Sequence, residues 1–161
     1  SYDDEALSLT KGQTISQPTT VALMFELLQL KVGDRVLDIG SGSGWTTAML
    51  AKIVGKQGKV IGLEIEPELV QLGRENLAKY HFPWAKIIQA GQQLGLPNEP
   101  PFDRILVSAS AKYLPQELID ELKIGGILVT PVGQSVVRLK RGREQNIVDQ
   151  YPGFVFVPLI H

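Results

Sequence analysis

Length, composition and charge narrow the possibilities first. The chain has 161 residues, of which 43% are hydrophobic and 20% charged, with a formal net charge of -1; we therefore expect one globular domain, residues 1–161, with no general affinity for nucleic acid. No cysteine and only two histidines occur, which excludes a disulfide framework and argues against a metal site. No apolar run approaches the roughly 20 residues that a bilayer requires, and the acidic opening is unlike a signal peptide, so we expect a cytoplasmic protein without membrane contact.

Helical and extended patterns alternate along the chain. Val21, Met24, Phe25 and Leu28 recur at i, i+3, i+4 and i+7, which predicts an amphipathic helix from Pro18 to about residue 30. In chain order we then expect a strand at 35–39, a helix at 45–54, a strand at 59–63, a helix at 67–79, strands at 86–88 and 104–107, a helix at 115–123 and a strand at 126–130.

Two further expected strands, 135–139 and 154–157, follow each other without an intervening helix and predict a hairpin. Alternating strands and helices favour a parallel sheet with both faces covered, and a hairpin adds an antiparallel edge. The predicted fold is α/β: a three-layer α/β/α Rossmann-like sandwich around a mostly parallel seven-stranded sheet.

A glycine-rich loop joins the first of these strands to its helix. In such a sheet, ligands bind beyond the carboxyl ends of the strands, near the first strand, and glycines let a ligand approach the backbone closely. An acid about twenty residues further on, at the end of the second strand, can accept hydrogen bonds from ribose hydroxyls. These features predict a nucleotide-type cofactor site formed by Asp38, Gly40, Ser41, Gly42, Gly44 and Glu64.

The details of the loop favour S-adenosylmethionine over a dinucleotide. The dinucleotide fingerprint needs a third glycine where this chain has Trp45. Asp38, just before the loop, would repel a pyrophosphate but attract the ammonium group of a methionine moiety. A tight connection without a ligand is the alternative. Glu66 and Glu68 fall at the start of the next helix, where acids complement the helix dipole, and we interpret them as structural.

Four segments carry a resemblance to a known family. They are 12–18 (Gly-Gln-Thr-Ile-Ser-Gln-Pro), 36–44 (Val-Leu-Asp-Ile-Gly-Ser-Gly-Ser-Gly), 125–133 (Gly-Gly-Ile-Leu-Val-Thr-Pro-Val-Gly) and 156–159 (Phe-Val-Pro-Leu). Together they resemble the protein-L-isoaspartate (D-aspartate) O-methyltransferases over nearly the whole chain. The glycine segment alone indicates only a class I methyltransferase, whereas segment 12–18 is much more particular to this family.

The resemblance implies an enzyme that transfers a methyl group from S-adenosylmethionine to the free α-carboxylate of an L-isoaspartyl residue in a damaged protein or peptide, leaving S-adenosylhomocysteine. The ester then collapses to a succinimide, which begins repair. An α-carboxylate has a pKa of about 3.5 and is already ionised at neutral pH, so this chemistry needs neither a general base nor a metal.

The resemblance also implies roles for particular residues. Ser16 matches the active-site hydroxyl that orients the substrate carboxylate, although its position before Pro18 also suits a helix N-cap. Gln13 and Thr14 would line the methionine side of the cofactor. Gln92, or its neighbour Gln93, would offer an amide oxygen to the adenine.

The sequence departs from the family at two places. Ala90-Gly91-Gln92 stands where relatives carry Gly-Asp-Gly, so we expect weaker cofactor binding, since a neutral acceptor forms a weaker hydrogen bond than a carboxylate. The chain also opens without the helical region that precedes segment 12–18 in relatives. Two alternatives stay open: methylation of another peptide carboxylate, or a cofactor-binding scaffold without catalysis.

The partners expected from the sequence are isoaspartyl proteins or peptides, not nucleic acid. A basic cluster at Arg138, Lys140, Arg141 and Arg143 is interpreted as a solvated edge hairpin. Charges on an edge strand oppose pairing between copies, so we expect a monomer.

Overall fold

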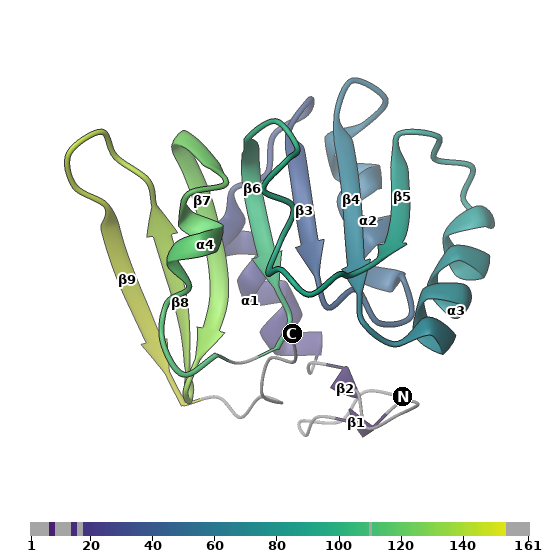
Figure 1. The fold of residues 1–161 in the computed structure, drawn as a ribbon, viewed down its shortest axis with the longest axis horizontal. Coiled ribbons are helices and arrows are strands. Elements are labelled where there is room, and N and C mark those ends of the chain that lie inside the picture. The colour runs from purple at the N-terminus through teal and green to yellow at the C-terminus, as the bar shows by residue number, and fades with distance from the viewer. Residues whose placement is uncertain (1–6, 9–13, 16–17, 110, 154–161) are drawn as a thin grey trace.

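The structure is a computed structural model that describes residues 7–8, 14–15, 18–109 and 111–153. Its centre is a seven-stranded sheet in the order β5-β4-β3-β6-β7-β8-β9 (Figure 1). The strands are β3 (Arg35–Ile39), β4 (Lys59–Glu64), β5 (Ala85–Gln89), β6 (Phe102–Val107), β7 (Leu122–Val132), β8 (Ser135–Lys140) and β9 (Ile147–Pro152). The pairs from β5 to β7 are parallel, whereas β8 and β9 are antiparallel. The predicted α/β sheet with its antiparallel edge is confirmed.

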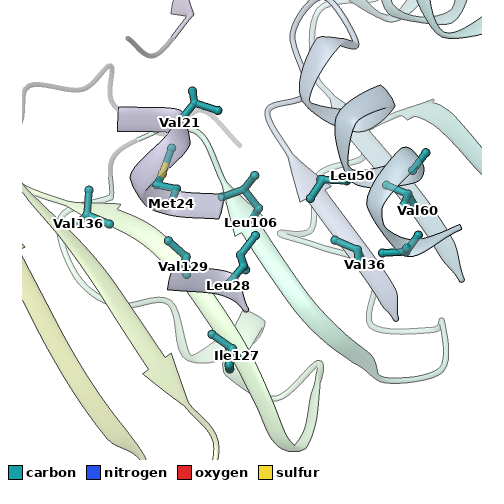
Figure 2. Packing of buried hydrophobic residues seen from close by; sticks show 12 residues of the cluster. Val21, Met24, Leu28, Val36, Leu50, Val60, Leu106, Ile127, Val129 and Val136 are labelled. Atoms are coloured by element: carbon teal, nitrogen blue, oxygen red, sulfur yellow. The ribbon is translucent and has the colours of Figure 1, made fainter. Parts of the chain in front are cut away.

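Three helices cover one face of the sheet: α1 (Pro18–Leu28), α2 (Trp45–Val54) and α3 (Pro67–Ala78). Val21, Met24 and Leu28 of α1 are buried against Val129 and Val136 in one apolar cluster (Figure 2). The predicted apolar stripe of α1 is therefore the side that packs on the sheet. A smaller cluster joins α2 and α3 to β5.

The second face has a thinner cover. Alternate strand residues such as Leu37 and Ile61 pack there with the short helix α4 (Gln116–Ile119) and with partly buried leucines of the β5–β6 and β6–α4 loops. The expected helix at 115–123 is wrong beyond Ile119. Phe102 donates its backbone N–H to the Glu121 carbonyl, and Leu122 pairs with Phe102 as β7 begins, so sheet pairing takes over where the helical pattern would continue.

The partner expected for β8 is also wrong. β8 pairs with Ile147–Pro152, while the expected strand 154–157 lies outside the described residues. All of β9 is exposed except the partly exposed Tyr151. An edge strand that is open on both faces shows no alternation of apolar and polar residues, which explains why the sequence pattern missed it.

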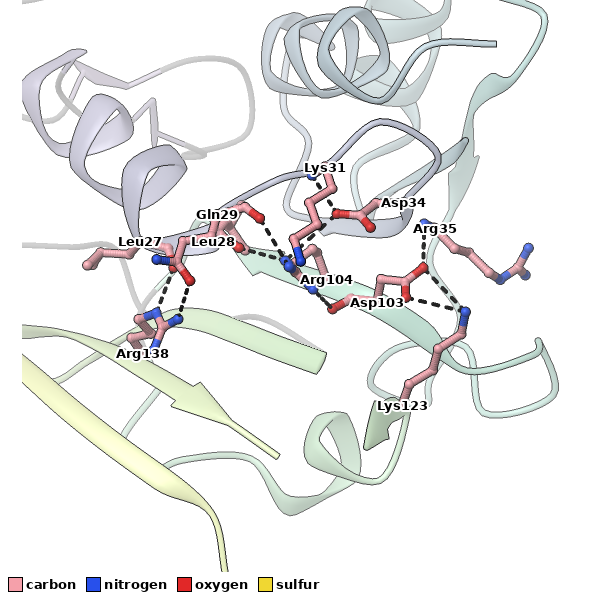
Figure 3. A network of polar contacts seen from close by, with 10 residues as sticks. All are labelled: Leu27, Leu28, Gln29, Lys31, Asp34, Arg35, Asp103, Arg104, Lys123 and Arg138. Atoms are coloured by element: carbon pink, nitrogen blue, oxygen red, sulfur yellow. Dashed lines mark hydrogen bonds and ion pairs between the residues drawn. The ribbon is translucent and has the colours of Figure 1, made fainter. Parts of the chain in front are cut away.

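Two arginines join α1 to the sheet (Figure 3). Arg104 of β6 donates to the carbonyl oxygens of Leu28 and Gln29, and Arg138 of β8 donates to that of Leu27, all near the end of α1. These bonds satisfy carbonyls that a helix leaves unpaired at its C-terminus. Arg141 likewise donates to carbonyls around the end of α4. The interpretation of the whole basic cluster as solvated is therefore wrong for Arg138 and Arg141.

A two-stranded antiparallel sheet precedes α1. It consists of β1 (Leu7–Ser8) and β2 (Thr14–Ile15), with Leu7 opposite Ile15 and Ser8 opposite Thr14. In Figure 1 this small sheet lies below the carboxyl ends of the central strands, the edge where the glycine loop emerges.

Candidate cofactor site

The glycine loop, residues 40–44, follows β3 at the carboxyl edge of the sheet. Gly40, Gly42 and Gly44 have φ angles of +77°, +57° and +85°, the left-handed region that glycine enters at little cost. The backbone N–H groups of Gly40 and Ser41 donate to the Leu63 carbonyl of β4. The loop thus turns beside β4 at the point where the chain leaves β3 toward α2, which is the switch point of a doubly wound sheet.

Helix α3 fixes the loop from outside. A Cβ atom at Gly44 would lie 2.7 Å from the Gly73 carbonyl oxygen, so two glycines allow α3 to contact the loop. Asn76 of the same helix donates from Nδ2 to the Ser43 carbonyl at 2.9 Å. These contacts were not predictable from the sequence, because the partners lie about thirty residues apart and no local pattern connects them.

Asp38 is fully buried below the loop. Its Oδ2 atom accepts hydrogen bonds from the hydroxyls of Thr46 at 2.8 Å and Thr47 at 2.7 Å, in the first turn of α2, while Oδ1 has no partner among the described residues. Burial raises the pKa of Asp38 to about 6, and the two hydroxyl bonds oppose part of that rise. One oxygen is therefore left to pair with a cationic ligand group. The two threonines are functional candidates that the sequence analysis did not identify.

Glu64 lies at the end of β4 and is 3% exposed. Oε1 accepts a hydrogen bond from the backbone N–H of Gly42 at 2.9 Å, and Oε2 accepts from those of Ile65 and Glu66. The two carboxylate oxygens offer about four acceptor positions, of which three are used. Glu64 thus binds the glycine loop directly and retains acceptor capacity for a hydroxyl group.

These residues fit the amino-acid and ribose parts of S-adenosylmethionine. The Asp38 Oδ1 atom and the Ser41 hydroxyl are buried, and neither has a partner in the part of the chain that the structure describes. Buried polar atoms in this state are rare in native proteins. Gly40 leaves space at the start of the loop, since a Cβ there would meet only the Ser108 Cβ, at 3.8 Å. The donors and acceptors needed to hold an ammonium group and a ribose therefore converge at one loop.

The structure does not bring every predicted residue to this loop. Gln92 is exposed on the segment after β5 and lines a pocket of ≈ 670 Å³ together with Gln93 and Glu121, a pocket whose lining excludes Asp38 and Glu64. Gln13 and Ser16 lie outside the described residues, while Thr14 is in β2.

The two glutamates that were interpreted as structural lie at the start of α3, as predicted. Glu66 is the N-cap residue of α3 and Glu68 lies in its first turn. Trp45 begins α2 and packs against the apolar cluster under α1. Among the described residues, no group of three or more histidine, aspartate or glutamate side chains could hold a metal ion, and none of the described helices is long and apolar enough to cross a bilayer.

A sheet of this topology, with one acid buried beneath its glycine loop and a second bound to that loop, defines a class I S-adenosylmethionine-dependent methyltransferase. The family model "Protein-L-isoaspartate(D-aspartate) O-methyltransferase (PCMT)" matches residues 1–161. The chain belongs to this family, as the resemblance indicated.

Individual relatives agree with this assignment. The chain is 42% identical over 160 residues to protein-L-isoaspartate O-methyltransferase 1 of Archaeoglobus fulgidus, covering 98% of this chain and 74% of the relative. It is 42% identical over 165 residues to protein-L-isoaspartate O-methyltransferase of Methanoculleus marisnigri, covering 99% and 73%. Among solved structures, a Plasmodium falciparum protein-L-isoaspartate O-methyltransferase in complex with S-adenosyl-L-homocysteine matches with a TM-score of 0.85 and 31% identity, over 98% of this chain and 81% of that one.

Proposed function

We propose that the chain transfers a methyl group from S-adenosylmethionine to the free α-carboxylate of L-isoaspartyl residues in damaged proteins or peptides. The observation that carries this proposal is the pair of buried acids, Asp38 and Glu64, on either side of the glycine loop in a chain whose family match spans residues 1–161. When bound, the cofactor supplies an electrophilic methyl group, whose bond to sulfur breaks as a bond to the carboxylate oxygen forms.

In this proposal the chain's residues mainly bind and orient. Asp38 pairs with the ammonium group through Oδ1, and Thr46 and Thr47 hold the other carboxylate oxygen in place. Glu64 accepts from the ribose while keeping its bond to Gly42. The backbone of Gly40, Ser41, Gly42 and Gly44 forms the floor of the site.

The substrate carboxylate needs no residue to remove a proton, because it is ionised at neutral pH. The chain therefore has to place the carboxylate in line with the methyl group and exclude water, since opposite charges neutralise each other as transfer proceeds. By family resemblance Ser16 would orient this carboxylate, Gln13 and Thr14 would line the methionine side, and Gln92 or Gln93 would face the adenine. We also propose that the chain is a monomer, which light scattering in solution tests. We propose that it is cytoplasmic, which localisation in cells tests.

A pair of synthetic peptides tests the function. An isoaspartyl peptide and its normal aspartyl isomer are incubated separately with the protein and S-adenosylmethionine, and mass spectrometry follows methyl ester, succinimide and S-adenosylhomocysteine. We expect turnover of the isoaspartyl peptide alone. Turnover of the normal isomer at a similar rate would indicate another carboxylate substrate, and cofactor binding without turnover of either peptide would indicate a scaffold without catalysis.

A further inference from the structure

After β6, Ser108 lies beside the glycine loop and Ala111 lies alongside the end of β7. Ser108 donates its backbone N–H to the Ile39 carbonyl at 3.0 Å, beside Gly40. Three residues later, Ala111 forms a bridge with Val132, and Gly133 donates its N–H to the Ala111 carbonyl at 3.0 Å. The backbone just before Lys112 is therefore held by β3 on one side and by β7 on the other.

Lys112 follows this fixed point and its side chain is exposed. It has no hydrogen-bond or ion-pair partner among the residues that the structure describes. The ammonium group of a lysine without a partner can pair with an incoming anionic group. The charge of Lys112 is thus available to a ligand.

The distribution of charge makes this lysine distinctive. Within the described ranges, Lys112 is the only lysine or arginine on the loops that follow the carboxyl ends of the parallel strands β3 to β7. The others lie along strands, on helices or at the opposite edge, where the antiparallel strand β8 ends before Arg141 and Arg143. The same edge as Lys112 carries the acids Asp38, Glu64 and Glu66. An anionic peptide that approaches this edge therefore meets acids close to the glycine loop and one cation farther along it.

The distance between the glycine loop and Lys112 determines which residue of a bound peptide lies near the lysine. β3 and β7 are separated by one strand, so their ends lie about 10 Å apart. An extended peptide advances about 3.4 Å per residue, so a side chain two to four residues from the reacting residue reaches Lys112. At physiological ionic strength the screening length is about 8 Å, which makes this attraction short in range.

We propose that Lys112 is a specificity-determining residue, which binds the carboxylate of an acidic side chain two to four residues from the isoaspartyl residue. The proposal rests on the proposed function and narrows its substrates to isoaspartyl sites with acidic neighbours. Lys112 contacts only the flanking residue, so it changes KM and leaves kcat nearly unchanged.

A peptide series tests this inference. Isoaspartyl peptides carry Glu, Gln or Lys at one position two, three or four residues to either side, and kcat/KM is measured for each. An exposed ion pair is expected to favour Glu over Gln by about two- to fivefold at the best position. Lys112→Gln should abolish this preference, Lys112→Glu should reverse it, and Lys112→Arg should keep it.

A matched control distinguishes the effect of the charge at Lys112 from the effect of the net charge of the protein. Lys56 is exposed in the turn before β4, at the opposite edge of the sheet, and Lys56→Gln removes the same charge. The Glu preference should survive this change and should shrink at high salt in the wild type. A preference that is equal in wild type and Lys112→Gln, or absent from the wild type, overturns the inference.

A second measurement distinguishes failure of the inference from failure of the proposed function. The Kd of each peptide is measured by fluorescence anisotropy in the presence of S-adenosylhomocysteine. If no peptide is methylated, the proposed function fails, while the ratio of Kd values for the Glu and Gln peptides still decides the role of Lys112. A ratio that Lys112→Gln returns to one supports the inference, and an unchanged ratio contradicts it.

Discussion

Asp38 and Glu121 are both buried carboxyl groups, but they lie in different surroundings. Asp38 accepts two hydroxyl hydrogen bonds under the glycine loop, and burial raises its pKa to about 6. Glu121, just before β7, accepts one from the backbone N–H of Leu96 at 2.7 Å, and burial raises its pKa to about 7. Each keeps one carboxyl oxygen that no described residue contacts by a hydrogen bond.

The difference lies in what surrounds the unpaired oxygen. The free Asp38 oxygen lies below the loop where a cationic group is expected to bind, so a ligand can offset the cost of its burial. The free Glu121 oxygen packs against Gly95, where a Cβ atom would be closer than any real contact allows. A raised pKa thus accompanies a proposed ligand contact at Asp38 and a loop contact at Glu121, so the surroundings of the carboxyl group, and not its pKa, distinguish the two.

Removing Glu64 should have the largest effect on binding. Glu64→Ala deletes the acceptor of the Gly42 N–H and the proposed ribose contact, and we expect the Kd for S-adenosylhomocysteine to rise by at least about a hundredfold, as two hydrogen bonds to a charged group are lost. Calorimetry measures this change. Glu66→Ala is the matched control, because Glu66 makes no side-chain cap bond at α3, and an equal loss in the control would contradict the assigned role.

Substituting Gly44 of the glycine loop should have the largest effect on the free energy of unfolding. Gly44→Ala places a methyl group against the Gly73 backbone at a φ of +85°, and we expect the free energy of unfolding to fall by about 3 kcal/mol or more. Gly125 has the same φ of +85° but open space around it, so Gly125→Ala measures the backbone strain alone. Urea unfolding compares the two. Equal losses would show that the contact between α3 and the loop contributes nothing.

Neutralising Glu121 should change the pH dependence of stability. The folded protein holds the Glu121 proton more tightly than the unfolded chain, so this group contributes stability below its ordinary pKa, and that contribution is lost as pH rises toward 7. The change in the free energy of unfolding caused by Glu121→Gln should therefore be more favourable at pH 8 than at pH 4, by about 1–2 kcal/mol. This figure is reduced for solvent screening, because Glu121 is only partly shielded. Thermal unfolding at both pH values measures this difference. A variant whose effect is the same at both would contradict the raised pKa.

Restoring the family's acid should have the smallest effect. A Cβ atom at Gly91 meets nothing within 4 Å, so Gly91→Asp has room to place a carboxylate near the expected adenine position. We expect the Kd for S-adenosylhomocysteine to fall about threefold to tenfold, as a charged acceptor is added. Calorimetry on the purified variant tests this, and an unchanged Kd would count against the alignment of Ala90-Gly91-Gln92 with the family motif.

The parts of the molecule that repeat a local pattern were predictable from the sequence. The period of Val21, Met24 and Leu28 predicted α1, and the apolar run and glycines around Asp38 predicted the succession of β3, glycine loop and α2. The cofactor site at that loop stays a prediction. Contacts between distant segments were not predictable, such as the bonds from Arg104 and Arg138 to the end of α1 or the contact of Gly44 with Gly73. The predictions for the exposed strand β9 and for the end of the α4 helix were wrong for a related reason, since pairing with distant strands determines both.

The most direct test of the cofactor site is calorimetry of S-adenosylhomocysteine binding from pH 5 to pH 8. If the Asp38 carboxylate pairs with the ammonium group, affinity in the wild type should weaken as pH falls through about 6, because protonation removes the negative charge. Glu121→Gln should show the same profile, whereas Asp38→Asn should bind weakly at every pH. A wild-type affinity that stays constant over this range, or equal binding by Asp38→Asn, would contradict the assignment of this loop as the cofactor site.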